Sequence, residues 1–522
     1  MKVLVADAIA EEGIARLRQC ATVEVKTRLS PAELCEEVRH YDALVVRSQT
    51  RITADVIEQG RNLKVIGRAG VGVDNIDVEA ATRCGIVVVN APAGNTVSAA
   101  EHTMALMLAL ARNLPEADAE VRKGAWPRAR LMGLELRNKT LGIVGLGNIG
   151  AQVALRAQAF EMQTIAYDPY VPADYAKTFK VTLVSLQELL AQSDFITLHI
   201  PLSQATKNLI GPAELEIVKP TARIINCARG GVVDEEAVAA ALHDGSLAGA
   251  AFDVFAEEPP TGSPLLSAPH CVLTPHLGAS TVEAQTNVAV DVADQIISVL
   301  QGRMAKYAVN APHASAELIP YMEMSATVGS FASQLMDGQI RKVNVCYAGE
   351  LQRMDSEPLK AGVISGILAP ATEERVNIVN AELVARQRGL RIAEETSPDC
   401  GSYGNLLTVA LETDRGTTTV SGTVRDGITR IIRINDFWMD ISLTERHFLI
   451  CDHIDGPGLV GAIGTVLGQA SINISSMHLS RLAPRGEALF VMALDEPLGE
   501  AQRNVILAIP NIHTARTVSL QA

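Results

Sequence analysis

The stretch Leu141-Gly-Ile-Val-Gly145-Leu-Gly147-Asn-Ile-Gly150 decides the fold of this chain. An apolar run enters three glycines, of which the first permits a tight turn, the second lets a ligand approach the backbone, and the third lets a helix pack on a strand. A β-type run, Thr164–Tyr167, then ends at Asp168. This order predicts a dinucleotide site, with the pyrophosphate at the helix N-terminus and Asp168 at the adenosine ribose.

Size and composition are typical of a multi-domain enzyme. The chain has 522 residues, too many for one hydrophobic core, and its net charge of −14 predicts no general attraction to nucleic acid or to an anionic membrane. Its 8 cysteines form no Cys-x-x-Cys pair, so we expect neither a zinc site nor a disulfide framework. No signal peptide and no bilayer-spanning run are apparent, which predicts a cytoplasmic protein without a membrane partner.

Short β-branched runs alternate with helical stretches up to about residue 310, a pattern typical of α/β proteins with parallel sheets. A helix at 98–112 separates two such units, and a long helix at 281–300 can carry the chain back to the first unit. The dinucleotide domain is therefore expected to be inserted within another domain. The expected boundaries are 1–97 and 283–312 for the outer domain, 98–282 for the dinucleotide domain, 317–445 for a region of alternating strands and one helix, and 447–522 for a βαββαβ module.

Three polar residues lie in loops that should follow strands of the dinucleotide domain, namely Arg229, Glu258 and His276. Ligands of open α/β sheets bind at the carboxyl ends of the strands, so these loops can converge beside a nicotinamide. Oxidation of a 2-hydroxy acid requires a base, and the imidazole of His276 titrates in the useful range. Glu258 would fix its tautomer and stabilise the imidazolium. Arg229 would hold the substrate carboxylate, and Asp253 is expected close to the nicotinamide.

Simpler interpretations compete with these roles. His276 could make structural hydrogen bonds at a helix start, and Arg229 could satisfy the carbonyl groups of its own glycine-rich loop. Glu257 stands directly beside Glu258 and could take its place. His199 lies at a strand end, where it could simply line the cofactor site.

Further motifs carry a family resemblance: Val46-Arg-Ser48, Gly67-Arg-Ala-Gly70, Asn226–Asp234, Phe252–Pro260 and Pro275–Thr281. With the glycine loop, they make the sequence similar to the D-isomer-specific 2-hydroxyacid dehydrogenase family, and in particular to its long members. The resemblance implies a flavodoxin-like substrate domain split around a Rossmann-type NAD domain, then an α+β intervening domain and a ferredoxin-like ACT domain. It favours the glutamate directly before Pro259, which is Glu258.

The resemblance also implies an activity and a set of site residues. The activity is NAD-dependent oxidation of 3-phospho-D-glycerate to 3-phosphohydroxypyruvate, the first step of L-serine biosynthesis, in a homo-oligomer such as a homotetramer. Arg128 would be lent by the neighbouring subunit, although it could also be ordinary solvated surface. The cofactor set is Gly145, Gly147, Asn148, Ile149, Gly150, Asp168, His199, Pro201, Thr206, Ala228, Asp253, His276 and Gly278. The substrate set is Arg47, Ser48, Arg68, Gly70, Asn95, Arg128, Arg229 and His276.

The C-terminal segment resembles an ACT domain, a module that pairs side by side and binds amino acids between its copies. The predicted effector residues are His453, Asp455, Gly458 and Asn473, with L-serine as the effector. The alternative is an ACT fold that serves assembly only. Two other functions also stay open, namely a glyoxylate or hydroxypyruvate reductase and an NAD-sensing scaffold without catalysis. The three arginines Arg47, Arg68 and Arg128 and the two added domains favour the phosphorylated substrate over the first of these.

Overall fold

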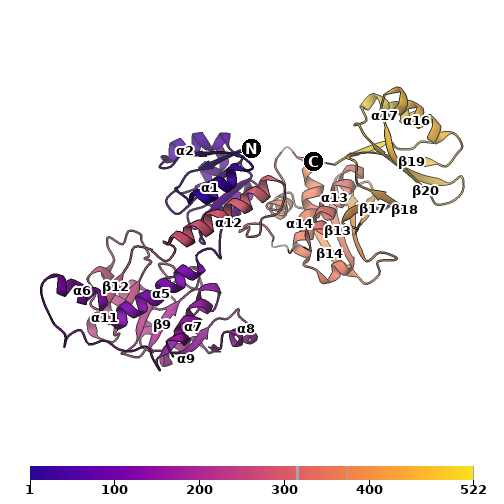
Figure 1. Cartoon of the computed structure of the whole chain (residues 1–522). Helices are drawn as coiled ribbons and strands as arrows, with labels where there is room; N and C mark the ends of the chain where they lie inside the picture. The colour runs from indigo at the N-terminus through magenta and orange to yellow at the C-terminus, as the bar shows by residue number, and fades with distance from the viewer. Residues whose placement is uncertain (313–314, 316, 373, 521–522) are drawn as a thin grey trace.

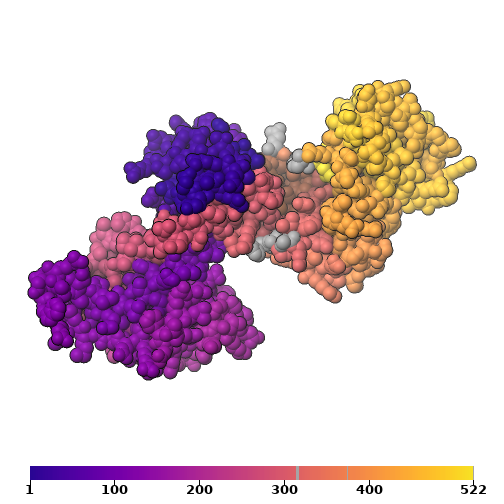
Figure 2. All heavy atoms as spheres, viewed as in Figure 1, coloured from indigo at the N-terminus to yellow at the C-terminus, as the bar shows by residue number. Residues whose placement is uncertain are grey.

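The structure is a computed structural model that describes residues 1–312, 315, 317–372 and 374–520. Its strands form four sheets that follow one another along the chain, and Figure 1 shows the corresponding regions from indigo to yellow. The space-filling view in Figure 2 shows a pink segment, which includes helix α12 (Val282–Leu300), between the indigo and the purple regions. Within the described residues, no helix combines the length and the apolar character that crossing a membrane requires.

The first sheet is parallel, with the strand order β2-β1-β3-β4-β5. Parallel sheets are covered on both faces, which explains why all four apolar residues of β3 are buried. The strand order reverses between β1 and β3, the place where open α/β sheets bind ligands. The elements are β1 (Lys2–Val5), α1 (Glu11–Arg18), β2 (Thr22–Val25), α2 (Pro31–Glu37), β3 (Ala43–Val46), α3 (Ala54–Gln59), β4 (Val65–Arg68), α4 (Val78–Arg83) and β5 (Val87–Val89).

The second sheet has seven parallel strands in the order β12-β11-β10-β9-β6-β7-β8, and it confirms the predicted Rossmann-type fold. Its order reverses between β9 and β6, so the glycine turn after β6 lies at the switch point. The elements are β6 (Thr140–Val144), α7 (Asn148–Ala159), β7 (Gln163–Tyr167), α8 (Ala173–Thr178), β8 (Thr182–Leu183), α9 (Leu186–Gln192), β9 (Phe195–Leu198), α10 (Pro212–Leu215), β10 (Arg223–Asn226), α11 (Glu235–Asp244), β11 (Gly249–Phe252) and β12 (Cys271–Leu273).

Two long helices connect these sheets. Helix α5 (Thr96–Ala111) leaves the first sheet after β5, and α6 (Leu114–Arg122) follows it on the surface of the second region. Helix α12 begins where the Thr281 hydroxyl accepts the N–H of Ala284 at 3.1 Å, and it packs on α1 and β4 of the first region. The N–H of Val309 then donates to the Val88 carbonyl at 2.7 Å, so the returning chain pairs with β5.

The third sheet is mixed, with the order β14-β13-β15-β16-β17-β18, and only its β13–β14 pair is parallel. The expectation of one helix here is wrong, because the described part contains α13 (Ile319–Leu335), α14 (Ser356–Leu368) and α15 (Ala381–Gln387). Glycine and serine lower the intrinsic helix propensity of this region. A side chain at Gly366 would collide with the Ala326 carbonyl, so the two helices pack too closely for a larger residue there. This close packing of α13 on α14 stabilises both helices despite their low propensity. The strands are β13 (Ile340–Gly349), β14 (Arg391–Ser397), β15 (Asn405–Thr413), β16 (Thr417–Arg425), β17 (Ile428–Ile434) and β18 (Phe437–Ser442).

The fourth sheet is antiparallel, with the order β20-β21-β19-β22. Its elements follow one another as strand, helix, strand, strand, helix, strand, the order read from the sequence. Residues 521–522 of the expected C-terminal domain lie outside the described residues. The elements are β19 (His447–Ile454), α16 (Leu459–Gln469), β20 (Ile474–Arg481), β21 (Glu487–Leu494), α17 (Glu500–Leu507) and β22 (Arg516–Ser519).

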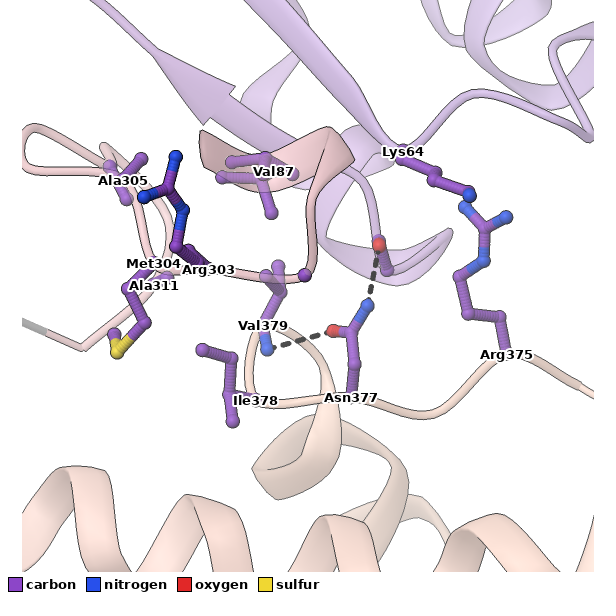
Figure 3. A pocket seen from close by; sticks show the side chains of 14 residues that line it. Lys64, Val87, Arg303, Met304, Ala305, Ala311, Arg375, Asn377, Ile378 and Val379 are labelled. Atoms are coloured by element: carbon purple, nitrogen blue, oxygen red, sulfur yellow. Dashed lines mark hydrogen bonds between the residues drawn. The ribbon is translucent and has the colours of Figure 1, made fainter. Parts of the chain in front are cut away.

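The first and third regions touch at a pocket of about 350 Å³. Figure 3 shows Asn377, whose side chain donates to the Gly85 carbonyl at 2.8 Å, beside Arg375, which donates to the Leu63 carbonyl. The pocket walls are largely apolar and include Val87 and Ile378. None of its lining residues belongs to the predicted catalytic, cofactor or substrate sets, so this junction is separate from the site described next.

Candidate active site

The glycine turn after β6 has the geometry that a pyrophosphate requires. Gly145 has φ 94°, and a Cβ there would lie 2.5 Å from the His199 carbonyl oxygen. A Cβ at Gly150 would collide with the Gly145 carbonyl, so the helix packs directly on the turn. Above Gly147, by contrast, no described atom lies within 4 Å of an added Cβ. This open approach stands at the N-terminus of α7, where the backbone N–H groups of Asn148 and Ile149 favour an anion.

Asp168 is bound to the same turn. Its two carboxylate oxygens accept the N–H groups of Leu146 and Tyr170, both at 2.9 Å. A carboxylate oxygen has two lone pairs, so each oxygen can still accept one ribose hydroxyl. The side chain is therefore oriented by the backbone toward the place that the sequence predicts for the adenosine.

His199, at the end of β9, is partly exposed as a residue, but its Nδ1 is buried. Burial lowers the pKa of its imidazole to about 3, so the ring stays neutral at physiological pH. Its Nε2 lies 3.0 Å from the Thr197 hydroxyl, while its Nδ1 is buried without a partner among the described residues. In the loop after β9, the Thr206 hydroxyl donates to the Pro201 carbonyl at 2.7 Å. In the loop after β10, the N–H of Ala228 donates to the Asn226 side chain at 3.0 Å. These contacts shape the loops that the sequence assigned to the cofactor.

The structure brings His276 and Glu258 into direct contact. The imidazole Nδ1 lies 2.9 Å and 3.1 Å from the two carboxylate oxygens of Glu258. Glu258 is held in turn, because its Oε1 accepts the N–H of Phe255 at 3.2 Å. A carboxylate on Nδ1 fixes the tautomer and leaves Nε2 available for a substrate proton. Both side chains are nearly half exposed, so a ligand can reach them.

Arg229 lies beside this pair. The loop that carries it packs on the Glu258 loop so closely that a Cβ at Gly230 would collide with the Phe255 carbonyl. The Arg229 guanidinium reaches the first region, where its Nε lies 3.5 Å from the Asp74 carboxylate and its Nη2 covers Gly72. Its Nη1 also donates to the Ala228 carbonyl at 2.7 Å, which is the structural role that competes with substrate binding.

Two more arginines of the first region gather near Arg229. The Arg68 guanidinium covers Gly70, and burial, with the nearby charge of Arg229, lowers its pKa to about 10. Arg47 also acts on Arg68 as a like charge. The Nε of Arg68 and the Oδ1 of Asn95 are buried without a partner among the described residues. A group of cations held this close together is suited to a polyanion.

The loop of Arg47 and Ser48 is organised by Asp7, a residue that the sequence analysis did not identify. The buried Asp7 carboxylate follows β1 and accepts the N–H groups of Arg47 at 2.6 Å and Thr50 at 3.2 Å, together with the Thr50 hydroxyl at 2.6 Å. Asn75 completes the loop by donating to the Arg47 and Thr50 carbonyls at 2.7 Å and 2.6 Å. The position of this acid just after a buried strand was the sequence signal that could have identified Asp7.

Asp253 is buried inside the loop that carries His276. Its carboxylate accepts the N–H groups of Leu277 at 2.7 Å and Gly278 at 2.8 Å, and the Thr274 hydroxyl at 2.6 Å. Burial opposes its ionisation, but the side-chain hydrogen bonds and the N–H of Leu277 lower its pKa below the usual value. The contacts of Asp253 therefore fix the shape of the catalytic loop.

Some predicted site residues are not brought together within one chain. Arg128 is exposed on the loop after α6, and none of its described contacts joins it to Arg229. Asp455 follows the end of β19 and is bound by Arg481 at 2.8 Å. Asn473 precedes β20 and is bound to Asp495 at 2.7 Å, at the opposite end of the same sheet. His453 is buried, and Gly458 caps α16 with φ 86°.

Comparison with known proteins agrees with this geometry. Residues 104–278 match the model of the D-isomer specific 2-hydroxyacid dehydrogenase NAD binding domain, and residues 317–435 match that of the D-3-phosphoglycerate dehydrogenase intervening domain. D-3-phosphoglycerate dehydrogenase of Synechocystis sp. is 45% identical over 99% of this chain and 95% of its own length. The chain belongs to the D-3-phosphoglycerate dehydrogenase family. The Methanocaldococcus jannaschii relative of the same name is 42% identical over 100% of both chains.

Solved structures of the wider family cover the first two regions. D-lactate dehydrogenase from Aquifex aeolicus, in complex with NAD and lactic acid, has a TM-score of 0.54 and 26% identity, and the match covers 59% of this chain and 99% of that one. The open glycine turn and the oriented Asp168 fit NAD, in agreement with the matched NAD binding domain. The protein is therefore an NAD-dependent enzyme of this family.

Proposed function

We propose that the enzyme oxidises 3-phospho-D-glycerate to 3-phosphohydroxypyruvate with NAD, the first step of L-serine biosynthesis. The observation that carries the proposal is the close packing of the Arg229 loop on the Glu258 loop, because it joins the His276–Glu258 pair to the group formed by Arg47, Arg68 and Arg229. The pair provides a base, and the arginines provide partners for a molecule with both a carboxylate and a phosphate. The activity in the names of the full-length relatives agrees with this assignment.

Each residue has a role in the reaction that its contacts support. Arg229 binds the substrate carboxylate with its planar fork and orients the C2 hydroxyl toward His276. The His276 Nε2 accepts the hydroxyl proton as the C2–O bond becomes a carbonyl, and Glu258 stabilises the imidazolium through Nδ1. The chemistry that NAD supplies when bound is acceptance of the hydride from C2. His199, whose pKa is lowered by desolvation of its ring, stays neutral and takes no part in the proton transfer.

The substrate phosphate is assigned to the first region. Arg47 and Arg68 supply charge, Ser48 and Gly70 belong to the same two loops, and Asn95 directly precedes α5. Arg128 of the partner subunit would complete this group, because within one chain it is exposed and joined to none of them. This assignment therefore includes a homo-oligomer.

A substrate panel tests the proposed function. Turnover is measured for 3-phospho-D-glycerate, D-glycerate and D-lactate at saturating NAD. We expect kcat/KM to favour the phosphorylated acid by at least about 100-fold, because a site built for a charged group rejects analogues that lack it. Equal kcat/KM values for D-glycerate and 3-phospho-D-glycerate would favour the alternative function, a glyoxylate or hydroxypyruvate reductase. Binding of NADH without turnover of any acid would favour the NAD-sensing scaffold.

We also propose that L-serine inhibits the enzyme by binding between two C-terminal modules of the ACT type. Strand β20 is an edge strand, and its side chains Met477 and Leu479 are exposed. If two β20 edges paired antiparallel, the Asn473 end of one copy would approach the Asp455 end of the other. A carboxylate and an amide would then face the ammonium and carboxylate of one amino acid.

Calorimetry and inhibition kinetics test the effector proposal. Serine should lower activity, and Asn473→Ala should remove the response while basal turnover is retained. A differential affinity of about 1–3 kcal/mol for two subunit arrangements gives a 5- to 150-fold effect. Asn504→Ala, at an exposed asparagine of α17, is the matched control. Absence of serine binding to the intact enzyme would leave this module with an assembly role only.

A further inference from the structure

Helix α5 lies directly under the loop that carries His276. The Ser98 hydroxyl is 2.7 Å from that of Thr281, at the end of the loop. A Cβ at Gly278 would lie 4.0 Å from the Cβ of Ala99. One turn further along α5, His102 points at Asp253, the acid inside the loop. Positions 98, 99 and 102 lie on one side of a helix, so a continuous face of α5 contacts the loop.

Among the side chains that contact the Asp253 carboxylate, His102 is the one that belongs to α5. Its Nε2 lies 3.1 Å from the Asp253 carboxylate and 3.2 Å from the Thr274 hydroxyl. Because Asp253 is ionised and the Thr274 hydroxyl donates to it, Nε2 carries the proton and donates. The side chains of His102 and Asp253 are 19% and 1% exposed, so water competes little for this bond.

The Asp253 carboxylate joins His102 to the catalytic histidine. Its Oδ1 accepts from His102, Thr274 and the N–H of Leu277, and its Oδ2 accepts from the N–H of Gly278. The N–H of His276 itself donates to the Asp253 carbonyl at 2.9 Å. The residues on both sides of His276 are thus bonded to one acid, whose own position depends on a donor from α5.

We propose that His102 is a positioning residue, which holds Asp253 so that the loop presents the His276 imidazole at the correct place for proton transfer. The inference rests on the base role of His276 proposed above. Because α5 also connects the two parallel sheets, His102 ties the placement of the base to the helix between the substrate and cofactor regions. A misplacement of about 1 Å can lower a rate by about 100-fold, so such a residue affects kcat without contacting substrate.

The test compares two replacements of His102 in the full-length enzyme. His102→Gln keeps an N–H donor at similar reach, whereas His102→Leu keeps bulk and removes the donor. We expect His102→Leu to lower kcat by about 10- to 100-fold. KM for NAD should change much less than kcat, since the glycine turn and Asp168 are untouched, and His102→Gln should recover most of kcat. Glu101→Gln, at the neighbouring exposed residue of α5, is the control.

An isotope effect separates positioning from simple loss of structure. With substrate deuterated at C2, His102→Leu should show a larger primary isotope effect than the wild type, because the chemical step becomes limiting. Thr274→Val removes a second donor to Asp253 and should change kcat and the isotope effect in the same direction, even if His102→Leu fails to fold.

Normal kcat in His102→Leu or in Thr274→Val would overturn the inference. So would an equal loss in His102→Gln and His102→Leu, because the donor would then not matter. A His276→Ala enzyme measured in parallel keeps the two proposals apart. If that variant retains turnover, the proposed base is wrong, whereas a severe loss there together with a normal His102→Leu enzyme removes only the positioning role.

Discussion

The candidate ligand sites of the two parallel sheets lie at the same topological place but contain different groups. In the first sheet, the switch point lies between β1 and β3, which are followed by Asp7 and by Arg47. In the second, it lies between β6 and β9, which are followed by the glycine turn and by His199. Side-chain guanidinium groups gather at the first site, and backbone N–H groups at the second.

This difference predicts how each site responds to substitution. A site made from side chains loses affinity when one of them is replaced, whereas a turn made from backbone keeps its N–H groups and is damaged only where an added side chain collides. Gly150 is such a position, because a Cβ there meets the Gly145 carbonyl. The proposed catalytic residues depend on both regions, since Arg229 of the second region reaches Asp74 of the first.

The largest expected effect is at these proposed catalytic residues. His276→Ala should lower kcat by about 100-fold or more, because the imidazole acts on the reacting proton. NADH affinity, measured by fluorescence titration, should remain near that of the wild type. His270→Ala, at another histidine near β12, serves as the control. Turnover near the wild-type value in the His276 variant would contradict the proposed mechanism.

The side-chain site should be the next most sensitive. Arg229→Ala removes hydrogen bonds to the substrate carboxylate, which for a charged group are worth about 1.5–3 kcal/mol each, so kcat/KM for the substrate should fall by about 10- to 100-fold. Arg229→Lys should retain only part of the wild-type kcat/KM, because lysine lacks the planar fork of arginine. Steady-state kinetics with varied substrate measures both variants. Arg137→Ala, on an exposed surface pair with Glu161, should change nothing.

The turn site should respond in selectivity more than in rate. Asp168→Ala removes the acceptor of the ribose hydroxyls and the charge that repels a 2′-phosphate, so the preference for NAD over NADP should narrow by about tenfold. The ratio of kcat/KM values for the two cofactors measures this. Asp174→Ala, an exposed acid of α8, is the control. More efficient use of NADP than of NAD by the wild type would show that the role of Asp168 is wrong.

The sequence predicted the second sheet and the turn after its first strand because local patterns determine them. Gly145, Gly147 and Gly150 specify a turn through backbone sterics, and Asp168 follows at a fixed interval, so no distant contact is needed to recognise them. The family prediction, which depended on such motifs, is confirmed by relatives that match the full length. The prediction of one helix in the third region was wrong, because the packing of α13 on α14 overrides the low helix propensity of their glycines.

Contacts between distant segments could not be read from the chain. His102 and Asp253 are 151 residues apart, and the cation group joins Arg68 to Arg229 across two regions. The sequence also gave no sign that Asp455 and Asn473 would lie at opposite ends of one sheet, because strand register decides that. Such pairs are visible only once the sheets have fixed which loops meet.

The smallest expected effect sharpens the contrast between the two sites. Asp7→Asn keeps the size of the side chain but weakens its bonds to the N–H groups of Arg47 and Thr50, so the loop should loosen while both arginines of the first site remain. Loss of about 0.5–1.5 kcal/mol of hydrogen bonding corresponds to a rise in KM for the substrate of about two- to tenfold, with kcat and KM for NAD unchanged. Asp55→Asn, in the first turn of α3, is the matched control. Steady-state kinetics with each substrate varied in turn separates the two KM values. If Asp7→Asn raised KM for NAD instead, the two switch points would not divide substrate and cofactor as the strand orders indicate.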